Sequence, residues 1–154
     1  MTDVSFKIES ALFNFRVAAV IVLESQVLLC RLKKEQFWFL PGGRVKLGET
    51  TREALSRELK EELGGEHQIG RLMCCMENFF DHKSAQFHEI CFIYEVAMLG
   101  SKQDLNDIQS HLDAGEEFKF FPFSELQRLD LKPPGLERII SQNNDDCAHV
   151  VVGR

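Results

Sequence analysis

The sequence predicts an α/β (α+β) sandwich in which helices pack against a mixed sheet. Two observations support this class. Two pairs of extended segments are each joined by a short polar turn, and one helix-forming segment lies between the pairs. Strands and helices mixed in this way bury their apolar faces by stacking as layers. The chain has no linker-like, repeated or low-complexity stretch, so residues 1–154 are expected to form a single domain.

The N-terminal half contains runs of apolar and β-branched residues that have the length of strands. Residues 16–24 (RVAAVIVLE) and 26–32 (QVLLCRL) meet at a Glu-Ser turn, which is typical of a hairpin. Residues 37–40 (FWFL) predict a brief strand that runs into a Pro-Gly-Gly turn at 41–43. This half therefore predicts three strands followed by a sharp turn.

A helix is expected from about Thr51 to Leu63. Thr50 or Thr51 supplies its N-cap, and Gly64 supplies its C-terminal stop. The leucines at 55, 59 and 63 form a ridge that suits packing against the core.

The C-terminal half begins with two long extended segments, 68–81 and 86–98, which predict a second hairpin. In the second segment, even-numbered residues from His88 to Tyr94 are expected to face one way. Odd-numbered residues from Phe87 to Ile93 are expected to face the other. The remaining expected elements are an exposed polar loop at 101–114, a strand at 117–121, short helices at 124–129 and 134–142, and an edge strand at 147–152.

The composition of the chain limits the kinds of binding partner that are expected. The formal net charge is −6, and nucleic-acid binding needs clustered Lys and Arg, so nucleic acid is not expected as a partner. The longest apolar run, Val17–Leu23, has only the length of a strand, and no basic-then-apolar leader begins the chain. A cytoplasmic protein without a membrane partner is therefore expected, and homo-oligomer formation is left open.

The chain has five cysteines, an odd number without the spacing of a metal site. Buried free thiols in a reducing cytosol explain them better than disulfides do. They are Cys30, Cys74, Cys75, Cys91 and Cys147.

Three glutamates lie close together on one face of the predicted helix. Glu61 and Glu62 follow Glu58 by three and four residues, which places them beside it on the helix surface. Two carboxylates about 4 Å apart repel by about 4 kcal/mol at an effective dielectric near 20. The pattern leaves three outcomes open: the side chains splay into water, one takes up a proton, or a divalent cation binds among them.

The run from Gly43 to Gly65 resembles the signature of the Nudix hydrolases, G-x5-E-x7-R-E-U-x-E-E-x-G-U, where U is a bulky apolar residue. The matching positions are Gly43, Glu49, Arg57, Glu58, Leu59, Glu61, Glu62 and Gly64. The one departure is Gly65 at the closing apolar position, which removes a packing residue but no implied ligand. The resemblance implies the α-β-α sandwich of that family. It also implies hydrolysis of a pyrophosphate bond, with Mg²⁺ or Mn²⁺, in a nucleoside diphosphate linked to another moiety.

The resemblance also implies roles for the signature residues. Arg57 would orient the glutamates by ion pairing, and Glu49 would organise the junction of loop and helix rather than bind metal directly. The implied metal ligands are the carboxylates of Glu58, Glu61 and Glu62 and the carbonyl of Gly43.

The general base is left open. Glu61 or Glu62 could take a proton from the attacking water. Glu117 is another candidate, because the segment Phe120-Phe121-Pro122 that follows it is similar to one that follows a distal glutamate in many relatives. Further candidates outside the signature are Glu89 and Glu116, whereas His82 and His111 are expected to be plain surface residues.

Substrate contacts are expected from cations and aromatic side chains near the glycine turn. Arg44 adjoins Gly43 and is the first candidate for a phosphate contact. Trp38 and Phe80 could stack on a base, although core packing is the alternative for Phe80 and its neighbour Phe79. Further cationic candidates are Arg31, Arg16 and Lys46.

The choice of substrate is barely constrained. About fifteen residues past the signature, ADP-ribose enzymes of the family tend to carry a proline, and dinucleoside polyphosphate enzymes a tyrosine. This chain has Phe79-Phe80-Asp81 there. The candidate substrates that remain are nucleoside triphosphates, nucleotide sugars and related small nucleotides. Two alternatives come from other classes: a nucleotide-sensing or regulatory module without catalysis, and an RNA-end processing hydrolase, against which the acidic charge counts.

Overall fold

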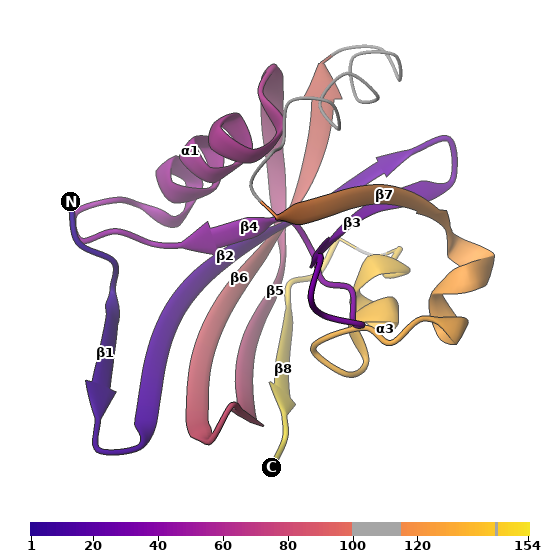
Figure 1. Ribbon diagram of the computed structural model, residues 1–154. Coiled ribbons are helices and arrows are strands. Elements are labelled where there is room, and N and C mark those ends of the chain that lie inside the picture. The colour runs from indigo at the N-terminus through magenta and orange to yellow at the C-terminus, as the bar shows by residue number, and fades with distance from the viewer. Residues whose placement is uncertain (100–114, 144) are drawn as a thin grey trace.

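A mixed sheet runs through the molecule with helices on both faces, as Figure 1 shows. The computed structural model describes residues 1–99, 115–143 and 145–154. Its strands are β1 (Ser5–Ile8), β2 (Ala11–Leu23), β3 (Gln26–Leu32), β4 (Gly42–Arg44), β5 (Glu66–His82), β6 (Ala85–Leu99), β7 (Glu116–Pro122) and β8 (Ala148–Val152). Its helices are α1 (Thr51–Leu63), the 3-10 helix η1 (Phe123–Arg128) and α3 (Leu136–Ile140). The predicted sandwich is confirmed.

The long strand β2 organises the sheet, whose order is β7-β3-β2-β6-β5-β8. One edge of β2 pairs in parallel with β6 from Ala11 to Ile21. The other edge pairs in turn with β1, with β4 and, at the end of β2, with β3. Because β4 carries the glycine turn, this pairing places the turn beside the middle of β2. The parallel β2–β6 and β5–β8 pairs make the sheet mixed.

Two apolar cores lie on opposite faces of the sheet. The core under α1 contains the helix residues Leu55, Leu59 and Leu63, together with Tyr94 and Val96 of β6. The core under η1 and α3 contains Leu126, Leu136, Ile139 and Ile140, together with Cys91 and Ile93 of β6. The predicted alternation along β6 is therefore confirmed.

Helix α1 has the limits that its caps predict. Thr50 is the N-cap: its hydroxyl accepts a hydrogen bond from the Glu53 backbone N–H, and the Glu53 carboxylate accepts one from the Thr50 N–H at 2.8 Å. This reciprocal pair satisfies two donors that a helix start leaves free. The helix ends at Gly64, whose φ of 63° favours glycine.

Several expected boundaries were wrong. The first predicted strand begins earlier, at Ala11, and pairs with β1, which is largely exposed and so gave no apolar run. Residues 37–40 form single bridges rather than a strand, Phe39 to Cys30 and Trp38 to Leu131. The helix expected at 134–142 contains only Leu136–Ile140. The loop expected at 101–114 lies outside the described residues.

Other expectations concern single residues. The predicted turn between β2 and β3 is confirmed, and both Glu24 and Ser25 have positive φ, as a two-residue hairpin turn requires. All five cysteines are free, but Cys147 is exposed, contrary to the expectation of buried thiols. Within the described residues, no helix is long and apolar enough to cross a membrane.

Candidate active site

The glycine turn and helix α1 meet without space for a side chain at residue 43. A Cβ atom added to Gly43 would lie 2.2 Å from Glu58 Cδ and 2.3 Å from Glu58 Oε2. At Gly42, where φ is 141°, a Cβ atom would lie 2.2 Å from the carbonyl oxygen of Val17. Glycine at 42 therefore lets the turn lie on β2, and glycine at 43 makes room for the Glu58 carboxylate.

Arg57 ties this carboxylate to the loop before the helix. Its Nε and Nη2 donate to the two oxygens of Glu49 at 2.7 and 3.0 Å, and its Nη1 donates to Glu58 Oε1 at 2.6 Å. Nη2 also donates to the carbonyl of Arg44 at 3.0 Å, and the Lys46 backbone N–H donates to Glu49 Oε2 at 2.9 Å. These bonds lower the pKa of Glu49 to about 2, chiefly through Arg57, and the same partners raise the pKa of Arg57. Two charge-assisted bonds to one carboxylate hold it in a single orientation.

Glu62 is a partly buried carboxylate of the cluster. Its Oε2 accepts a hydrogen bond from the Gly42 backbone N–H at 3.2 Å. Burial raises its pKa to about 8, and the nearby Glu116 and Glu58 add to the rise, against the Gly42 N–H and Arg16. By contrast, the Glu61 side chain is 57% exposed and lies 3.5 Å from Arg57 Nη1. Of the three helix glutamates, Glu58 and Glu62 therefore face the glycine turn.

The oxygen ligands of Glu58 and Glu62 fit a hard divalent cation, although they do not form a complete coordination shell. No three acidic, histidine or cysteine side chains in the described part of the chain already surround one point as metal ligands. Burial is the main cause of the raised pKa of Glu62, and the charges of Glu116 and Glu58 raise it further, so an acidic cluster without full compensation lies here. Carboxylate oxygens are ligands that Mg²⁺ prefers. A bound cation would offset the part of the rise that comes from the neighbouring carboxylates.

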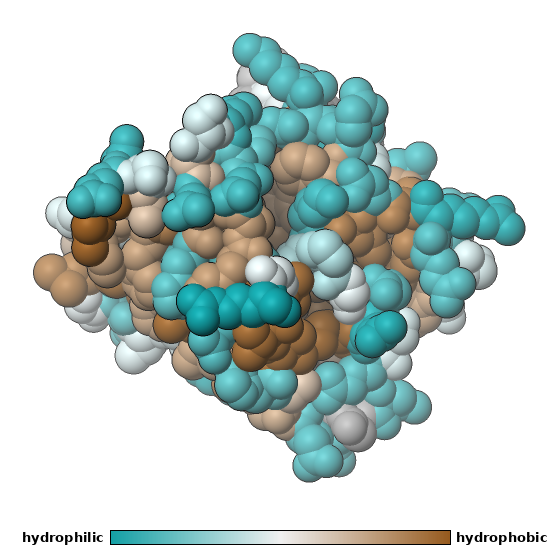
Figure 2. Space-filling view, turned by 90° about the horizontal axis from the view of Figure 1, so that it is seen from below, coloured by the Kyte–Doolittle hydropathy of each residue, from teal (hydrophilic) through white to brown (hydrophobic). Residues whose placement is uncertain are grey.

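A cleft of about 520 Å³ opens beside the cluster. Gly43, Arg44 and Glu58 line its end at the glycine turn. Its other side chains include the aromatic residues Phe37, Phe39, Phe80 and Phe87 and the polar residues Asn14, Arg16, Asn78, His82 and Glu89. Figure 2 looks onto the end of the sheet at which the β5–β6 turn lies, and there hydrophobic side chains gather among hydrophilic ones.

Some residues predicted from the sequence line this cleft. Arg44 does so, and its Nη1 lies 3.5 Å from Asp3, with both side chains at least 40% exposed. Phe80 also does so, and its ring stacks on Phe87 with the centroids 4.7 Å apart. His82, expected to be a plain surface residue, is another lining residue.

Other predicted residues lie elsewhere. Trp38 packs in the core against Phe121, and Arg31 covers its ring at 4.6 Å while also bonding to Glu117 at 2.8 Å. None of these three predicted site residues lines the cleft. The Trp38 backbone also forms a bridge to Leu131, a pairing that sequence spacing did not indicate.

The two neighbouring glutamates of β7 differ in environment. Glu117 pairs with Arg31, whereas Glu116 lies near enough to Glu62 and Glu58 to raise the pKa of Glu62. Successive side chains of a strand point to opposite faces, so only one of them can face the cluster. Of these two, Glu116 is therefore the carboxylate that lies near the helix glutamates, whereas Glu117 faces Arg31.

Two polar residues of the cleft were not expected. Asn14 and Asn78 are 3% and 6% exposed and flank Glu89, which is 6% exposed. The signal in the sequence was an asparagine next to phenylalanines in each strand: Phe13 and Phe15 flank Asn14, and Phe79 follows Asn78. His88, next to Glu89, instead stacks on Phe79 at 4.3 Å, and His111 lies outside the described residues.

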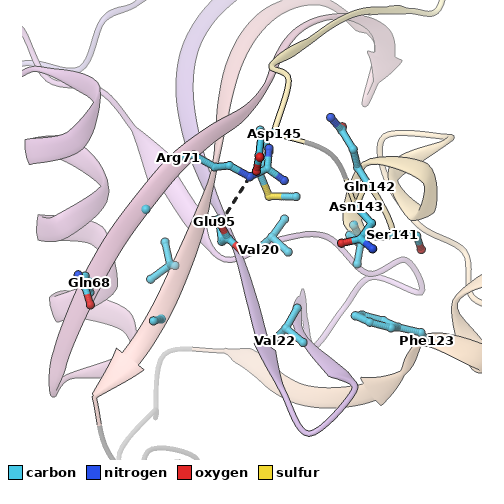
Figure 3. Close-up of a pocket in the computed structure, with 15 residues that line it drawn as sticks. Val20, Val22, Gln68, Arg71, Glu95, Phe123, Ser141, Gln142, Asn143 and Asp145 are labelled. Atoms are coloured by element: carbon cyan, nitrogen blue, oxygen red, sulfur yellow. Dashed lines mark ion pairs between the residues drawn. The ribbon is translucent and has the colours of Figure 1, made fainter.

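A second cavity of about 760 Å³ lies at the far end of the same sheet, as Figure 3 shows. Arg71 and Glu95 form an ion pair at 3.6 Å on its sheet side, facing Ser141, Gln142 and Asn143. It contains no residue of the Gly43–Gly65 signature. The 520 Å³ cleft is therefore the cavity that the signature residues line.

Comparison with known proteins agrees with this geometry. Residues 13–142 match the model of the NUDIX domain, so the chain belongs to the Nudix family. It is 29% identical over 116 residues to the ADP-ribose pyrophosphatase of Methanocaldococcus jannaschii, covering 73% of this chain and 64% of that protein. A Bacillus subtilis relative is 28% identical over 116 residues, 75% of this chain and 53% of that protein. The chain thus spans less than two thirds of either relative.

The fold also matches solved structures. A crystal structure of an ADP-ribose pyrophosphatase from Streptococcus suis superposes with a TM-score of 0.62 at 15% identity. The match covers 88% of this chain and 98% of that one. At this identity the likeness concerns the fold alone.

Proposed function

We propose that this protein is a Mg²⁺- or Mn²⁺-dependent pyrophosphohydrolase that cleaves a nucleoside diphosphate linked to another moiety. The observation that carries the proposal is the contact between the glycine turn and helix α1. There the Glu58 carboxylate occupies the space of a missing Cβ, and Glu62 accepts from the Gly42 N–H. Family membership and the similarity to the ADP-ribose pyrophosphatase of Methanocaldococcus jannaschii support the same reaction class.

Glu58 and Glu62 would hold the cation, with the Gly43 carbonyl and the exposed Glu61 as further ligands. Such a cation, when bound, offsets charge on phosphate oxygens and makes a water nucleophilic. The rest of the site belongs to the chain itself. Arg57 keeps Glu58 in place through its bonds to Glu49, so its role is to position a ligand. Arg44 is exposed at the cleft and is suited to bind a phosphate.

Glu116 is the proposed proton acceptor. Burial raises its pKa, Arg16 opposes the rise, and Glu58 adds to it. A carboxylate with a raised pKa beside the cluster can hold a proton on its oxygen more readily than an exposed one. Glu61 is less suited to this role because it is largely in solvent.

A screen of nucleotide substrates with Mg²⁺ or Mn²⁺ tests the proposal, with the broken phosphate bond identified from the products. Glu62→Gln should lower kcat by about 100-fold or more, the scale of effects at groups that act on the transition state. Glu61→Gln should lower kcat less, because the Glu61 side chain is exposed. Glu95→Gln, outside the cleft, is the matched control and should retain turnover. Full activity of Glu62→Gln would contradict the proposal, as would nucleotide binding with no metal-stimulated product.

A further inference from the structure

A row of three buried polar side chains crosses the cleft. Asn14 of β2 is the register partner of Glu89 of β6, and Asn78 of β5 is the register partner of the same glutamate. The three residues therefore lie side by side on adjacent strands, and all three line the cleft. They are also the three buried polar or charged residues of the described chain. An apolar sheet that concentrates its buried polar groups at one point calls for a physical reason.

The protein itself does not satisfy these groups. The Asn14 side-chain oxygen accepts a hydrogen bond from the Ser5 hydroxyl at 2.7 Å, which leaves its NH₂ group as a donor. Asn78 makes no side-chain hydrogen bond within the described residues, and Glu89 has only the ion pair with Arg16 at 3.8 Å. The side-chain atoms of the described residues that are both enclosed and unpaired belong to His67 and Arg71 instead, so the polar atoms of Asn78 and Glu89 are open to the cleft that these residues line. The row therefore presents one strong acceptor between two amides to whatever enters the cleft.

The surroundings of the row suit a flat ring. Phe80 and Phe87 stack with their planes 9° apart at the same end of the cleft, and Phe37 and Phe39 add further aromatic surface. Rings of this kind favour an aromatic ligand over a flexible apolar one. Polar edge and aromatic walls together are the combination that recognises a nucleobase.

The register also relates the row to the signature residues. Gly43 on β4 pairs with Val17 of β2, and β6 lies on the other side of β2. Two inter-strand spacings separate β4 from β6, which is about 10 Å. Arg16 spans part of this distance, since it lies 3.8 Å from Glu89 and 3.4 Å from the Gly42 carbonyl. A ligand with its phosphates at the glycine turn would thus extend its far end toward the row.

We propose that Asn14, Glu89 and Asn78 bind the hydrogen-bonding edge of the substrate's nucleobase, with Glu89 accepting an N–H of the base. This inference rests on the proposed function, because it takes the phosphates to lie at the glycine turn. It makes Glu89 a specificity-determining residue rather than the general base. The ligand edge must carry an N–H donor, and methylation of that nitrogen removes the contact.

The test measures binding rather than turnover, so it stands apart from hydrolysis. ADP, GDP, CDP and UDP are titrated by calorimetry, and the tightest is compared with its analogue methylated at the edge nitrogen. The wild type should bind the methylated analogue about 10- to 100-fold more weakly, the cost of leaving a buried acceptor unpaired. The Glu89→Gln variant should bind the unmethylated nucleotide more weakly than the wild type does. The loss of affinity caused by methylation should also be smaller in this variant. Glu95→Gln, on the same strand but in the second cavity, should behave as wild type.

Asn78→Leu separates binding from a structural role. Because the Asn78 amide lines the cleft and makes no side-chain hydrogen bond within the described residues, its replacement should leave the Tm nearly unchanged, whereas it should weaken nucleotide binding by about 10-fold or more. If Asn78 supported the fold, the same substitution would lower the Tm. Equal affinity of the wild type for parent and methylated nucleotide would overturn the inference. A base-selective protein without hydrolysis would instead overturn only the proposed function.

Discussion

Gly43→Ala offers a sharp test of how the glycine turn and helix α1 cooperate. The backbone at residue 43 does not need positive φ, so alanine is not strained there by conformation. The obstacle is the Glu58 carboxylate, whose Cδ lies 2.2 Å from the position of the new Cβ. Ordinary contacts between carbon atoms begin near 3.5 Å. The carboxylate must therefore retreat by about 1.3 Å, the difference between these two distances.

The size of the effect follows from what Glu58 contacts. A retreat of this size breaks its 2.6 Å hydrogen bond from Arg57, while Arg57 keeps both bonds to Glu49. Because the side chains can relax, the loss of stability should be about 1 kcal/mol. This corresponds to a fall in Tm of about 2–4 °C for a domain of this size. A ligand displaced by about 1 Å can cost about 100-fold in turnover.

The assay combines Mn²⁺ titration, thermal unfolding and turnover of the best substrate from the nucleotide screen. Gly43→Ala should fold and yet bind Mn²⁺ more weakly and turn over about 100-fold more slowly. On a Glu58→Ala background, Gly43→Ala should add little, because the group it displaces is already absent. Wild-type Mn²⁺ affinity and turnover in Gly43→Ala would refute the reasoning. Full additivity of the two substitutions would also refute it.

Three further predictions concern stability. The pKa of Glu62 is raised to about 8. The contribution of this group to folding stability is therefore fully present below about pH 4.5 and is lost as the pH rises through 8. Calorimetry of the metal-free protein should therefore show a Tm that falls over this range, with more recovery by Mg²⁺ at pH 8.5 than at pH 5. A Tm that does not change with pH would show that the surroundings of Glu62 do not raise its pKa. Arg57→Lys keeps the charge but loses the paired bonds to Glu49, and should cost about 2 kcal/mol by urea denaturation. Thr50→Ala removes the N-cap of α1 and should cost about 1 kcal/mol, also by urea denaturation; an unchanged midpoint would contradict the role of the cap.

Local features were well predicted because neighbours in sequence determine them. Helix α1 begins after Thr50 and ends at Gly64, as the cap residues indicated. The spacing of Glu58 and Glu62 by four residues places both toward the glycine turn, since a helix repeats every 3.6 residues. The faces of β6 followed from alternation alone.

Features that depend on distant partners were predicted poorly. Trp38 was a candidate for stacking on a base, yet its ring lies in the core against Phe121. Glu117 was preferred over Glu116, although the register with β3 turns Glu117 toward Arg31. Neither placement can be derived from spacing within one segment, because each depends on which strands become neighbours.

By itself, the sequence determined the layers of the fold and the family signature, since caps, alternation and helical spacing are local properties. The tertiary structure decided that Glu62 is partly buried near Glu116 while Glu61 faces solvent. It also decided that Asn14, Glu89 and Asn78 form one row. The physical reason is register: the parallel pairing of β2 with β6 joins residues 75 positions apart. A shift of one residue would turn each of these side chains to the opposite face.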